Sequence, residues 1–561
     1  MTKSIDRAAT TRRLLLGRGA LALAALASLV APATAQERKE LGRMWTFEAA
    51  PVGWFQQAYD WAPSQEWLDH ARMSSLRFGR IEKGQVVNFC SASFVSAHGL
   101  IMTNHHCARD AIAAVQGQAD WLKDGFYAGA YENEVKLPGF QMTQLIAQAD
   151  VTKQVNEVGV DAVRKAAEEK DPAHTHQVIS LYQGGNYQLY TYRVFDDLRL
   201  VAAPHGQSAH FGGDPDNFCF PRWGLDFTFL RAYSGDRPVD SKEFHFAWRT
   251  EGAKEGDLVF VTGNPGSTGR LMSMAQVEFL RDHGYPTRLA EVKADLEKLY
   301  AQAKESAEQE RVLRAGILRL ENGRKAIQGY LDGVSNPRIL AIKQKAESTL
   351  RAAVASKPEL QAKYGDAWDK LAALQKERVA ALGDKEKTAA LQKLEAVQQK
   401  RIGEACFAIY GKSIPPDATM SLRLSDGVVK GYPMNGTLAP CFTTLYGLFA
   451  RHHEFGAHHP FDLPQVWLDQ EKQLDLKTPF NFVATCDIIG GNSGSPMIDK
   501  ERRIVGLIFD GNIESLGNRH VFDDEIARTV SVHPAIIIES LRKIYRAGKL
   551  ADELEQKSVA K

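Results

Sequence analysis

The chain has little cysteine: 6 residues among 561, and none of them belongs to a Cys-x-x-Cys pair. Zinc sites built on such pairs are therefore not indicated, and we expect no metal and no other cofactor. The chain also lacks an excess of charge, because 69 Lys and Arg balance 68 Asp and Glu for a net charge of +1. This balance gives no electrostatic reason to expect nucleic acid or a membrane surface as a partner.

Long apolar runs are absent beyond the N-terminus, so no later segment is expected to span a bilayer. Residues 1–13 are basic, and residues 14–30 are rich in Leu, Ala and Gly. Ala33-Thr34-Ala35 then fits a small-x-small cleavage site, and Arg12-Arg13 is typical of a twin-arginine signal. We predict a signal peptide over residues 1–35 and a periplasmic or secreted protein with no membrane contact after cleavage. A membrane anchor is the alternative.

The composition divides the rest of the chain into three parts. Residues 36–271 and 411–561 contain short apolar or alternating runs that predict strands. Residues 272–410 are rich in Ala, Glu, Lys, Leu and Gln, with apolar residues at three- and four-residue steps, which predicts packed helices. We therefore expect two β-rich segments separated by a helical insert.

A glycine-rich stretch, Gly490-Gly491-Asn492-Ser493-Gly494-Ser495-Pro496, lies between two apolar runs. A serine in such a turn has an exposed hydroxyl, and the surrounding backbone N–H groups can form an oxyanion hole for acyl transfer. An ordinary Gly/Asn/Ser turn is the alternative. A histidine stretch at residues 103–107 and an aspartate stretch at residues 214–227 precede this serine. The order His, Asp, Ser is that of the chymotrypsin-type proteases.

Export would permit disulfides among the cysteines. Cys90 and Cys107 bracket two predicted strands that lead to the histidine stretch. A bridge between them would fix the loop of a catalytic imidazole, whereas the alternative is a pair of buried free thiols. We favour the bridge and leave the pairing of the other four cysteines open.

These motifs resemble the S46 family of dipeptidyl peptidases. That resemblance implies an α+β fold: a chymotrypsin-like double β-barrel with an inserted α-helical cap. The first barrel part would span residues 36–271, the cap residues 272–410 and the second barrel part residues 411–561. It also implies release of dipeptides from peptides with a free N-terminus, no metal, and a homodimer. The matching stretches are Cys90–Ser96, Thr103–Cys107, Asp216-Asn217, Pro221-Arg222, Gly491–Pro496 and Phe509–Asn512.

The resemblance also assigns roles to individual residues. Ser493 would be the nucleophile, His106 the base and Asp226 the carboxylate that orients it. The N–H groups of Gly491 and Ser493 would form the oxyanion hole. The substrate's α-amine would be bound by Asn217, Phe218 and Asp510, because a buried ammonium needs a carboxylate and hydrogen-bond acceptors.

Two features depart from the family pattern. Phe218 stands where the family usually has Trp, so the indole hydrogen bond is lost. The helical insert is shorter than usual, so the cap would cover the cleft less completely, which puts strict dipeptide release in question.

The residue after Asp510 predicts the preference at P1, the residue whose carbonyl is cleaved. In the family an Arg there accompanies acidic P1 side chains and a Gly accompanies apolar ones, and this chain has Gly511 in that S1-pocket position. We therefore predict an apolar P1.

The alternatives are a dipeptidyl peptidase with acidic P1 preference, a trypsin-like endopeptidase, and a catalytically silent peptide-binding protein on the same fold. A blocked substrate N-terminus would separate the exopeptidase from the endopeptidase. Fluorophosphonate labelling would identify the silent protein.

Overall fold

The computed structural model describes residues 35–557. The predicted signal peptide lies outside the described residues, apart from Ala35 at its end. Within residues 35–557, no helix combines the length and the apolar character that a membrane crossing requires.

The strands before the helical insert form one antiparallel sheet of 11 strands, with the main path β4-β9-β10-β3-β2-β1-β6-β8-β7. Strand β8 shows why these segments pair, because its Tyr190 and Tyr192 are buried in the core while the neighbouring Leu189, Thr191 and Arg193 are partly exposed. The bounds are β1 Ser75–Glu82, β2 Gln85–Phe94, β3 Leu100–Thr103, β4 Phe126–Tyr127, β5 Val135–Lys136, β6 Phe140–Asp150, β7 Thr175–Leu181, β8 Asn186–Phe195, β9 Asp197–Ala203, β10 Thr228–Ser234 and β11 Arg237–Pro238.

A second sheet of 8 strands follows the path β14-β13-β19-β20-β21-β18-β17. Strands β12 and β13 precede the helical insert but pair with strands that follow it, so chain on both sides of the insert builds this sheet. The bounds are β12 Ala247–Trp248, β13 Leu258–Gly263, β14 Arg423–Val428, β17 Phe442–Thr444, β18 Pro479–Ala484, β19 Pro496–Ile498, β20 Arg503–Gly511 and β21 Thr529–Val532. A small hairpin is formed by β15 Tyr432–Met434 and β16 Thr437–Ala439.

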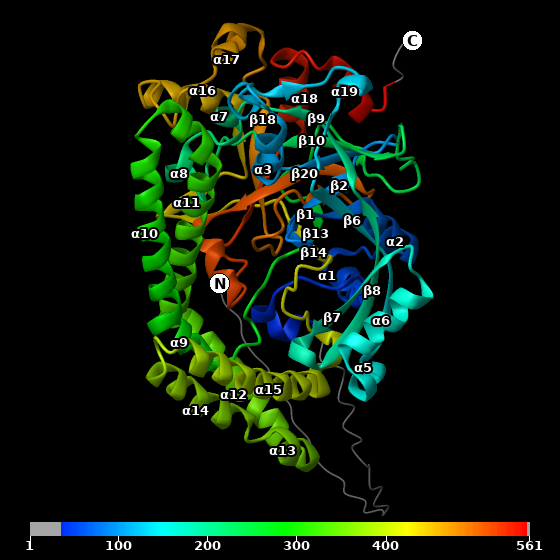
Figure 1. Ribbon diagram of the computed structural model, residues 1–561, viewed down its shortest axis with the longest axis vertical. Helices are drawn as coiled ribbons and strands as arrows, with labels where there is room; N and C mark the ends of the chain where they lie inside the picture. Colours follow the sequence, from blue (N-terminus) through cyan, green and yellow to red (C-terminus); the bar gives the residue numbers. More distant parts are fainter. Residues whose placement is uncertain (1–34, 558–561) are drawn as a thin grey trace, which may run out of the picture.

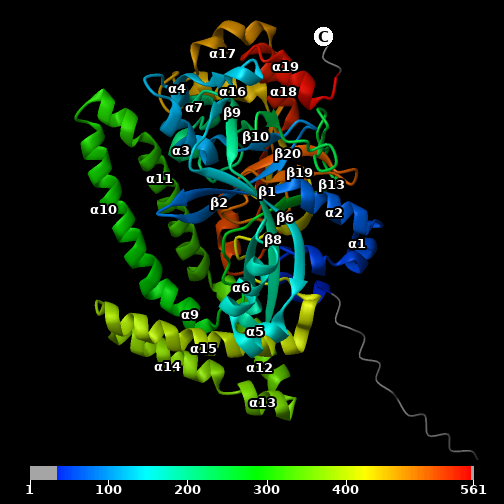
Figure 2. The same ribbon diagram turned by 45° about the vertical axis from the view of Figure 1, so that its right-hand side comes forward.

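Helices occupy the chain from Met274 to Tyr410. The long pair α10 and α11 lies beside the sheets, and the other helices of this segment, α9 and α12 to α15, lie together at one end of the molecule (Figures 1 and 2). Leu289, Val292 and Leu296 form the buried face of α10, as their spacing predicts. The bounds are α9 Met274–Phe279, α10 Tyr285–Ala303, α11 Ala307–Ser335, α12 Pro337–Ala355, α13 Pro358–Tyr364, α14 Ala367–Ala380 and α15 Lys385–Tyr410.

Shorter helices surround the two sheets. Helix α3 follows β3 directly, and α18 and α19 close the C-terminal end. The bounds are α1 Val52–Tyr59, α2 Gln65–Ser74, α3 His105–Val115, α4 Trp121–Asp124, α5 Thr152–Val158, α6 Val160–Lys170, α7 Gly206–Ala209, α8 Gly213–Asp216, α16 Leu445–Glu454, α17 Gln465–Gln470, α18 Pro534–Lys543 and α19 Gly548–Leu554.

The expected double barrel is not confirmed by the strand pairing of residues 35–557. The first sheet begins at β4 and ends at β7, the second begins at β14 and ends at β17, and neither path closes on itself. In the first sheet β6, β8 and β7 run out as a long ribbon instead of returning to β4 (Figure 1). The fold is a mixed one of helices and largely antiparallel open sheets.

Candidate active site

Strand pairing brings the histidine and the aspartate together. Strand β3 ends at Thr103, two residues before α3 begins, and β10 begins at Thr228, directly after the loop that carries Asp226. Because Thr103 and Thr228 are paired across the antiparallel ladder, the ends that carry His106 and Asp226 lie side by side.

His106 and Asp226 make two hydrogen bonds. The His106 backbone N–H donates to Asp226 Oδ1 at 3.0 Å, and His106 Nδ1 lies 2.6 Å from Asp226 Oδ2. Burial alone would raise the pKa of the Asp226 carboxyl, but the charge and hydrogen bonds of His106 lower that pKa to about 2. The carboxylate therefore stays ionised and holds the ring with its Nε2 directed away.

Ser493 lies in the turn between β18 and β19 of the second sheet, and this turn contacts β2 of the first sheet. Ser91 on β2 donates its N–H to the Ser493 carbonyl and its hydroxyl to the Gly491 carbonyl, both at 2.8 Å. These bonds hold the serine turn against the sheet that carries His106. Ser493 and His106 line the same cavity, but in the described residues their side chains make no hydrogen bond to each other. Catalytic hydrogen bonds are often long before substrate binds.

The backbone around Ser493 leaves two donors free. The Asn492 N–H donates to the Ile489 carbonyl at 3.0 Å, whereas the N–H groups of Gly491 and Ser493 donate to no described residue. Gly491 has φ +104°, and a Cβ there would lie 2.6 Å from the Asn264 carbonyl oxygen, so a larger residue would distort the turn. Two adjacent unused N–H groups beside a serine hydroxyl can stabilise an oxyanion.

The predicted disulfide is confirmed. Cys90 on β2 is bonded to Cys107 on α3, with the two Cα atoms 6.2 Å apart. The bond fixes the first turn of α3, which carries His106. Cys90, His106 and Cys107 are also a group of potential metal ligands, but the bridge leaves neither sulfur as a thiolate to bind one.

The residues predicted to bind the α-amine meet at one end of the same cavity. Asp510 Oδ2 accepts from the Phe218 N–H and from Arg222, each at 2.9 Å, and Oδ1 accepts from the Gly511 N–H. Burial raises the pKa of Asp510, and Arg222 opposes that shift. Asn217 donates through Nδ2 to Asn322 Oδ1 at 3.1 Å.

Arg222 and Asn322 are two residues of this site that the sequence did not reveal. Arg222 stands in the Pro221-Arg222 stretch that resembles the family, but the resemblance assigned it no role. Asn322 comes from α11, and nothing in its helical surroundings marks it. Phe218 contributes its backbone N–H, at φ +56°, as well as its ring.

Gly511 lies in the cavity but does not open a free apolar space. A Cβ on Gly511 would lie 2.3 Å from the Ser515 hydroxyl and 3.4 Å from the Arg528 carbonyl oxygen, so polar atoms already fill that volume. The cavity, of about 350 Å³, is lined by 4 arginines and 3 aspartates besides its apolar residues.

Curated relatives with similar sequences are dipeptidyl peptidases of two kinds. The Asp/Glu-specific dipeptidyl-peptidase of Shewanella putrefaciens is 25% identical, covering 84% of this chain and 91% of that protein. The dipeptidyl-peptidase 7 of Porphyromonas gingivalis is also 25% identical, covering 83% of this chain and 90% of that protein. In fold, the chain is similar to Porphyromonas endodontalis DPP11 bound to the dipeptide Arg-Glu, with a TM-score of 0.80 at 18% identity, over 92% of this chain and 99% of that one.

These comparisons contradict the apolar P1 preference predicted from Gly511. Asp/Glu-specific enzymes are among the similar sequences, and the similar structure holds a dipeptide that ends in Glu. The physical reason lies in the pocket, where Ser515 occupies the space beside Gly511 and arginines line the cavity. A single glycine was therefore too little to predict the pocket's polarity.

The comparison with family models agrees with the geometry. The model of peptidase S46 matches residues 39–386 and 380–556, which together are most of the chain and contain Ser493, His106 and Asp226. The chain belongs to the peptidase S46 family.

Proposed function

We propose that this peptidase is a serine dipeptidyl peptidase that acts on peptides with a free N-terminus and prefers an acidic P1 residue. One observation carries the exopeptidase part: Asp510 and Asn217 share a cavity of about 350 Å³ with Ser493 and His106. A buried carboxylate beside amide groups suits an α-ammonium. A cavity of that size holds about two residues between the amine and the nucleophile.

The chemistry follows from the contacts around Ser493. His106 takes the hydroxyl proton as the serine oxygen attacks the P1 carbonyl, and the N–H groups of Gly491 and Ser493 stabilise the oxyanion. His106 then protonates the leaving amine. Water, activated by the same ring, releases the dipeptide and restores the serine. Asp226 stabilises the imidazolium at each step.

Charge supports the acidic P1 preference. Arg80 and Arg319 both pair with the single carboxylate of Asp110, at 2.6 and 3.3 Å, and all three line the nucleophile's cavity. Arg80 also pairs with Glu82, which lies outside the cavity lining, so these residues balance one another. Over the whole lining, however, 4 arginines outnumber 3 aspartates. An acidic substrate side chain entering this cavity meets a net positive field.

An ion pair between Arg270 and Asp487 argues against the trypsin-like alternative. In trypsin-like enzymes a free aspartate at the base of the pocket pairs with a basic P1 residue. Here Asp487, upstream of Ser493, is buried and bound by Arg270 through two hydrogen bonds of 2.5 and 2.7 Å. The charge of Asp487 is therefore already paired with Arg270 and does not bind a basic substrate side chain.

The finer architecture is also part of this proposal. The two sheets correspond to the halves of a chymotrypsin-like fold, with residues 36–271 supplying His106 and Asp226 and residues 411–561 supplying Ser493. The helical residues 272–410 act as the cap, since α11 lines the cavity. The protein is also exported. It forms homodimers, and light scattering of the purified protein tests this oligomeric state.

The deciding experiment compares fluorogenic dipeptides that differ only at P1, with Glu, Gln, Leu or Phe, each with a free or acetylated N-terminus. We expect the highest kcat/KM for Glu with a free amine and no turnover of acetylated substrates. Equal rates on free and acetylated substrates would refute the exopeptidase assignment. A faster rate on Leu or Phe than on Glu would refute the acidic P1 preference alone.

A further inference from the structure

A second cavity, of about 830 Å³, opens on the other side of the His106–Asp226 pair. It is bounded by α3, by the segment of α7 and α8, and by α11. His106, Arg109, His210 and Asp226 line both this cavity and the smaller one that contains Ser493. The two cavities therefore adjoin at these side chains.

The second cavity lies beside the segment that leads to Asn217. Gly213 and Asp214 of α8 line it, and Asn217 follows directly after that helix. If Asn217 and Asp510 bind the substrate α-amine, the Cα of P2, the N-terminal residue, is one bond away. The side chain of P2 then enters the second cavity, whereas that of P1 lies near Gly511 and Ser515. This placement depends on the proposed function.

Arg109 is the cation at the junction of the two cavities. It stands one turn after His106 on α3, is half-buried, and makes no ion pair or side-chain hydrogen bond with residues 35–557. The carboxylates of Asp226 and Asp110 act on Arg109 through their charge, but Asp226 is bound by His106 and Asp110 by Arg80 and Arg319. Other charged groups nearby are also paired: Arg314 with Glu310 at 3.0 Å, and Arg324 with Asp214 at 2.7 Å. Glu321 accepts the Tyr300 hydroxyl hydrogen bond at 2.5 Å.

We propose that Arg109 is a specificity-determining residue that binds the carboxylate of an acidic P2 side chain. A guanidinium matches a carboxylate through two parallel hydrogen bonds, and partial burial strengthens the pairing. A half-buried cation without a partner costs stability in the free enzyme, and a bound carboxylate removes that cost. Neutral P2 residues can enter the cavity but leave the guanidinium unpaired.

The test uses Glu and Gln, which have nearly the same shape, at P2 of substrates with the same P1 residue and a free amine. We expect kcat/KM to be on the order of 10- to 100-fold higher for Glu, the range for one charge-assisted hydrogen-bonded pair. Arg109→Gln should bring the Glu/Gln ratio close to one, and Arg109→Lys should retain part of it. Arg109→Glu should favour Lys over Gln at P2.

Because each ratio compares two substrates on one preparation, a loss of folded enzyme does not affect it. Lys123→Gln is the matched control, since Lys123 is an exposed lysine that lines the same cavity, and its ratio should match the unmutated enzyme. A Glu/Gln ratio near one in the unmutated enzyme, or an unchanged ratio in Arg109→Gln, overturns the proposal. The proposal is also overturned if Arg109→Gln changes the Glu/Gln ratio for substrates that differ at P1 but not for substrates that differ at P2. Failure to release any dipeptide would instead refute the proposed function.

Discussion

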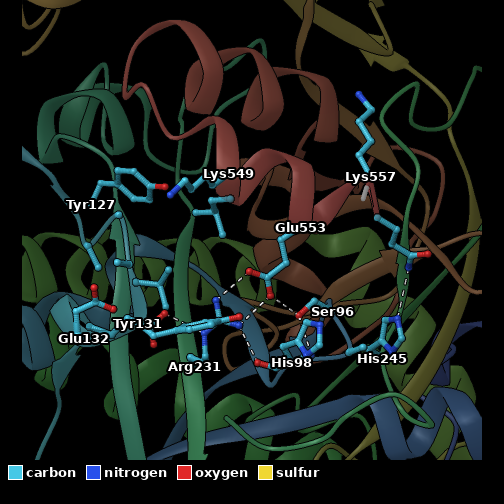
Figure 3. A pocket seen from close by; sticks show the side chains of 18 residues that line it. Ser96, His98, Tyr127, Tyr131, Glu132, Arg231, His245, Lys549, Glu553 and Lys557 are labelled. Atoms are coloured by element: carbon cyan, nitrogen blue, oxygen red, sulfur yellow. Dashed lines mark hydrogen bonds and ion pairs between the residues drawn. The ribbon is translucent and has the colours of Figure 1, made fainter. Parts of the chain in front are cut away.

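Two cavities of this protein contain clusters of charged residues, and they differ in how those charges are satisfied. A cavity of about 750 Å³ near the C-terminus surrounds Arg231, whose side chain is only 2% exposed. Arg231 pairs with Glu134 at 2.9 Å and with Glu553 at 2.8 Å, and the Ser96 hydroxyl also donates to Glu553 (Figure 3). Arg231, Glu134 and Glu553 are each paired, so this trio of charges ties α19 to the first sheet.

The catalytic cleft contains groups that lack partners. The N–H groups of Gly491 and Ser493 and the guanidinium of Arg109 have no acceptor among residues 35–557. Buried polar groups are normally satisfied, so such groups indicate where a ligand belongs. Cavity size therefore does not identify the active site here. Unsatisfied side-chain donors such as Trp45 Nε1 and Trp248 Nε1 also occur elsewhere, so what marks the cleft is unused backbone N–H groups beside a serine and a histidine.

The largest expected effect concerns the nucleophile. Ser493→Ala should lower kcat by at least about 10⁴-fold, while the thermal midpoint stays close to that of the unmutated protein, because the serine hydroxyl makes no hydrogen bond to residues 35–557. His106→Ala should cost a similar factor, and the double variant should lose little more, since the residues act as one unit. Steady-state kinetics on one dipeptidyl substrate would measure this, and additive losses would contradict it.

The sequence predicted which residues of the candidate site lie together better than it predicted their surroundings. The motifs around His106 and Ser493 are local, and the ladder between β3 and β10 brings Asp226 to the histidine. Asn322 was missed because its contact with Asn217 spans 105 positions and depends on how α11 packs. The apolar P1 preference was wrong, and closed barrels are not confirmed, for a similar reason. Sheet closure and the position of Ser515 depend on long-range packing, which a strand pattern or one glycine does not determine.

A substitution in the cluster of Arg231, Glu134 and Glu553 should lower the folding stability and leave the activity unchanged. Arg231→Met leaves the carboxylates of Glu134 and Glu553 buried without their cation, which should cost about 3–5 kcal/mol of folding stability. The kcat of the remaining folded enzyme should be unchanged, because the cluster does not touch the catalytic cleft. Denaturant unfolding and active-site titration would measure the two quantities. A large fall in kcat per active site would contradict the division between the cavities.

Asp510 combines both situations, since Arg222 pairs with it while the proposed substrate amine also needs it. Asp510→Asn should raise KM by roughly 10- to 100-fold, the effect of losing a hydrogen bond between charged groups. Arg222 is then left without its carboxylate, so some stability should also be lost. Asn322→Ala, which removes the contact to Asn217 without changing a charge, should raise KM less. If Asp510→Asn lowers kcat and leaves KM unchanged, the carboxylate does not bind the ground-state amine.

The smallest effect is a pH dependence of stability that separates two buried carboxyls. The folded-state pKa of Asp226, about 2, lies below its ordinary value of 3.8, so its interaction with His106 stabilises the fold above pH 4. That contribution, about 2 kcal/mol, should be lost as the pH falls from about 4 to about 2.

Asp426 has the opposite shift, because burial raises its pKa to about 6. Its contribution is full below pH 4 and is lost as the pH rises through about 6. Unfolding curves from pH 2 to 7 should therefore lose the acid-side slope in Asp226→Asn and the slope near pH 5 to 6 in Asp426→Asn. An Asp226→Asn variant that keeps the full acid-side loss would show that other carboxylates cause it, and that the pairing of Asp226 with His106 adds little to the stability of the fold.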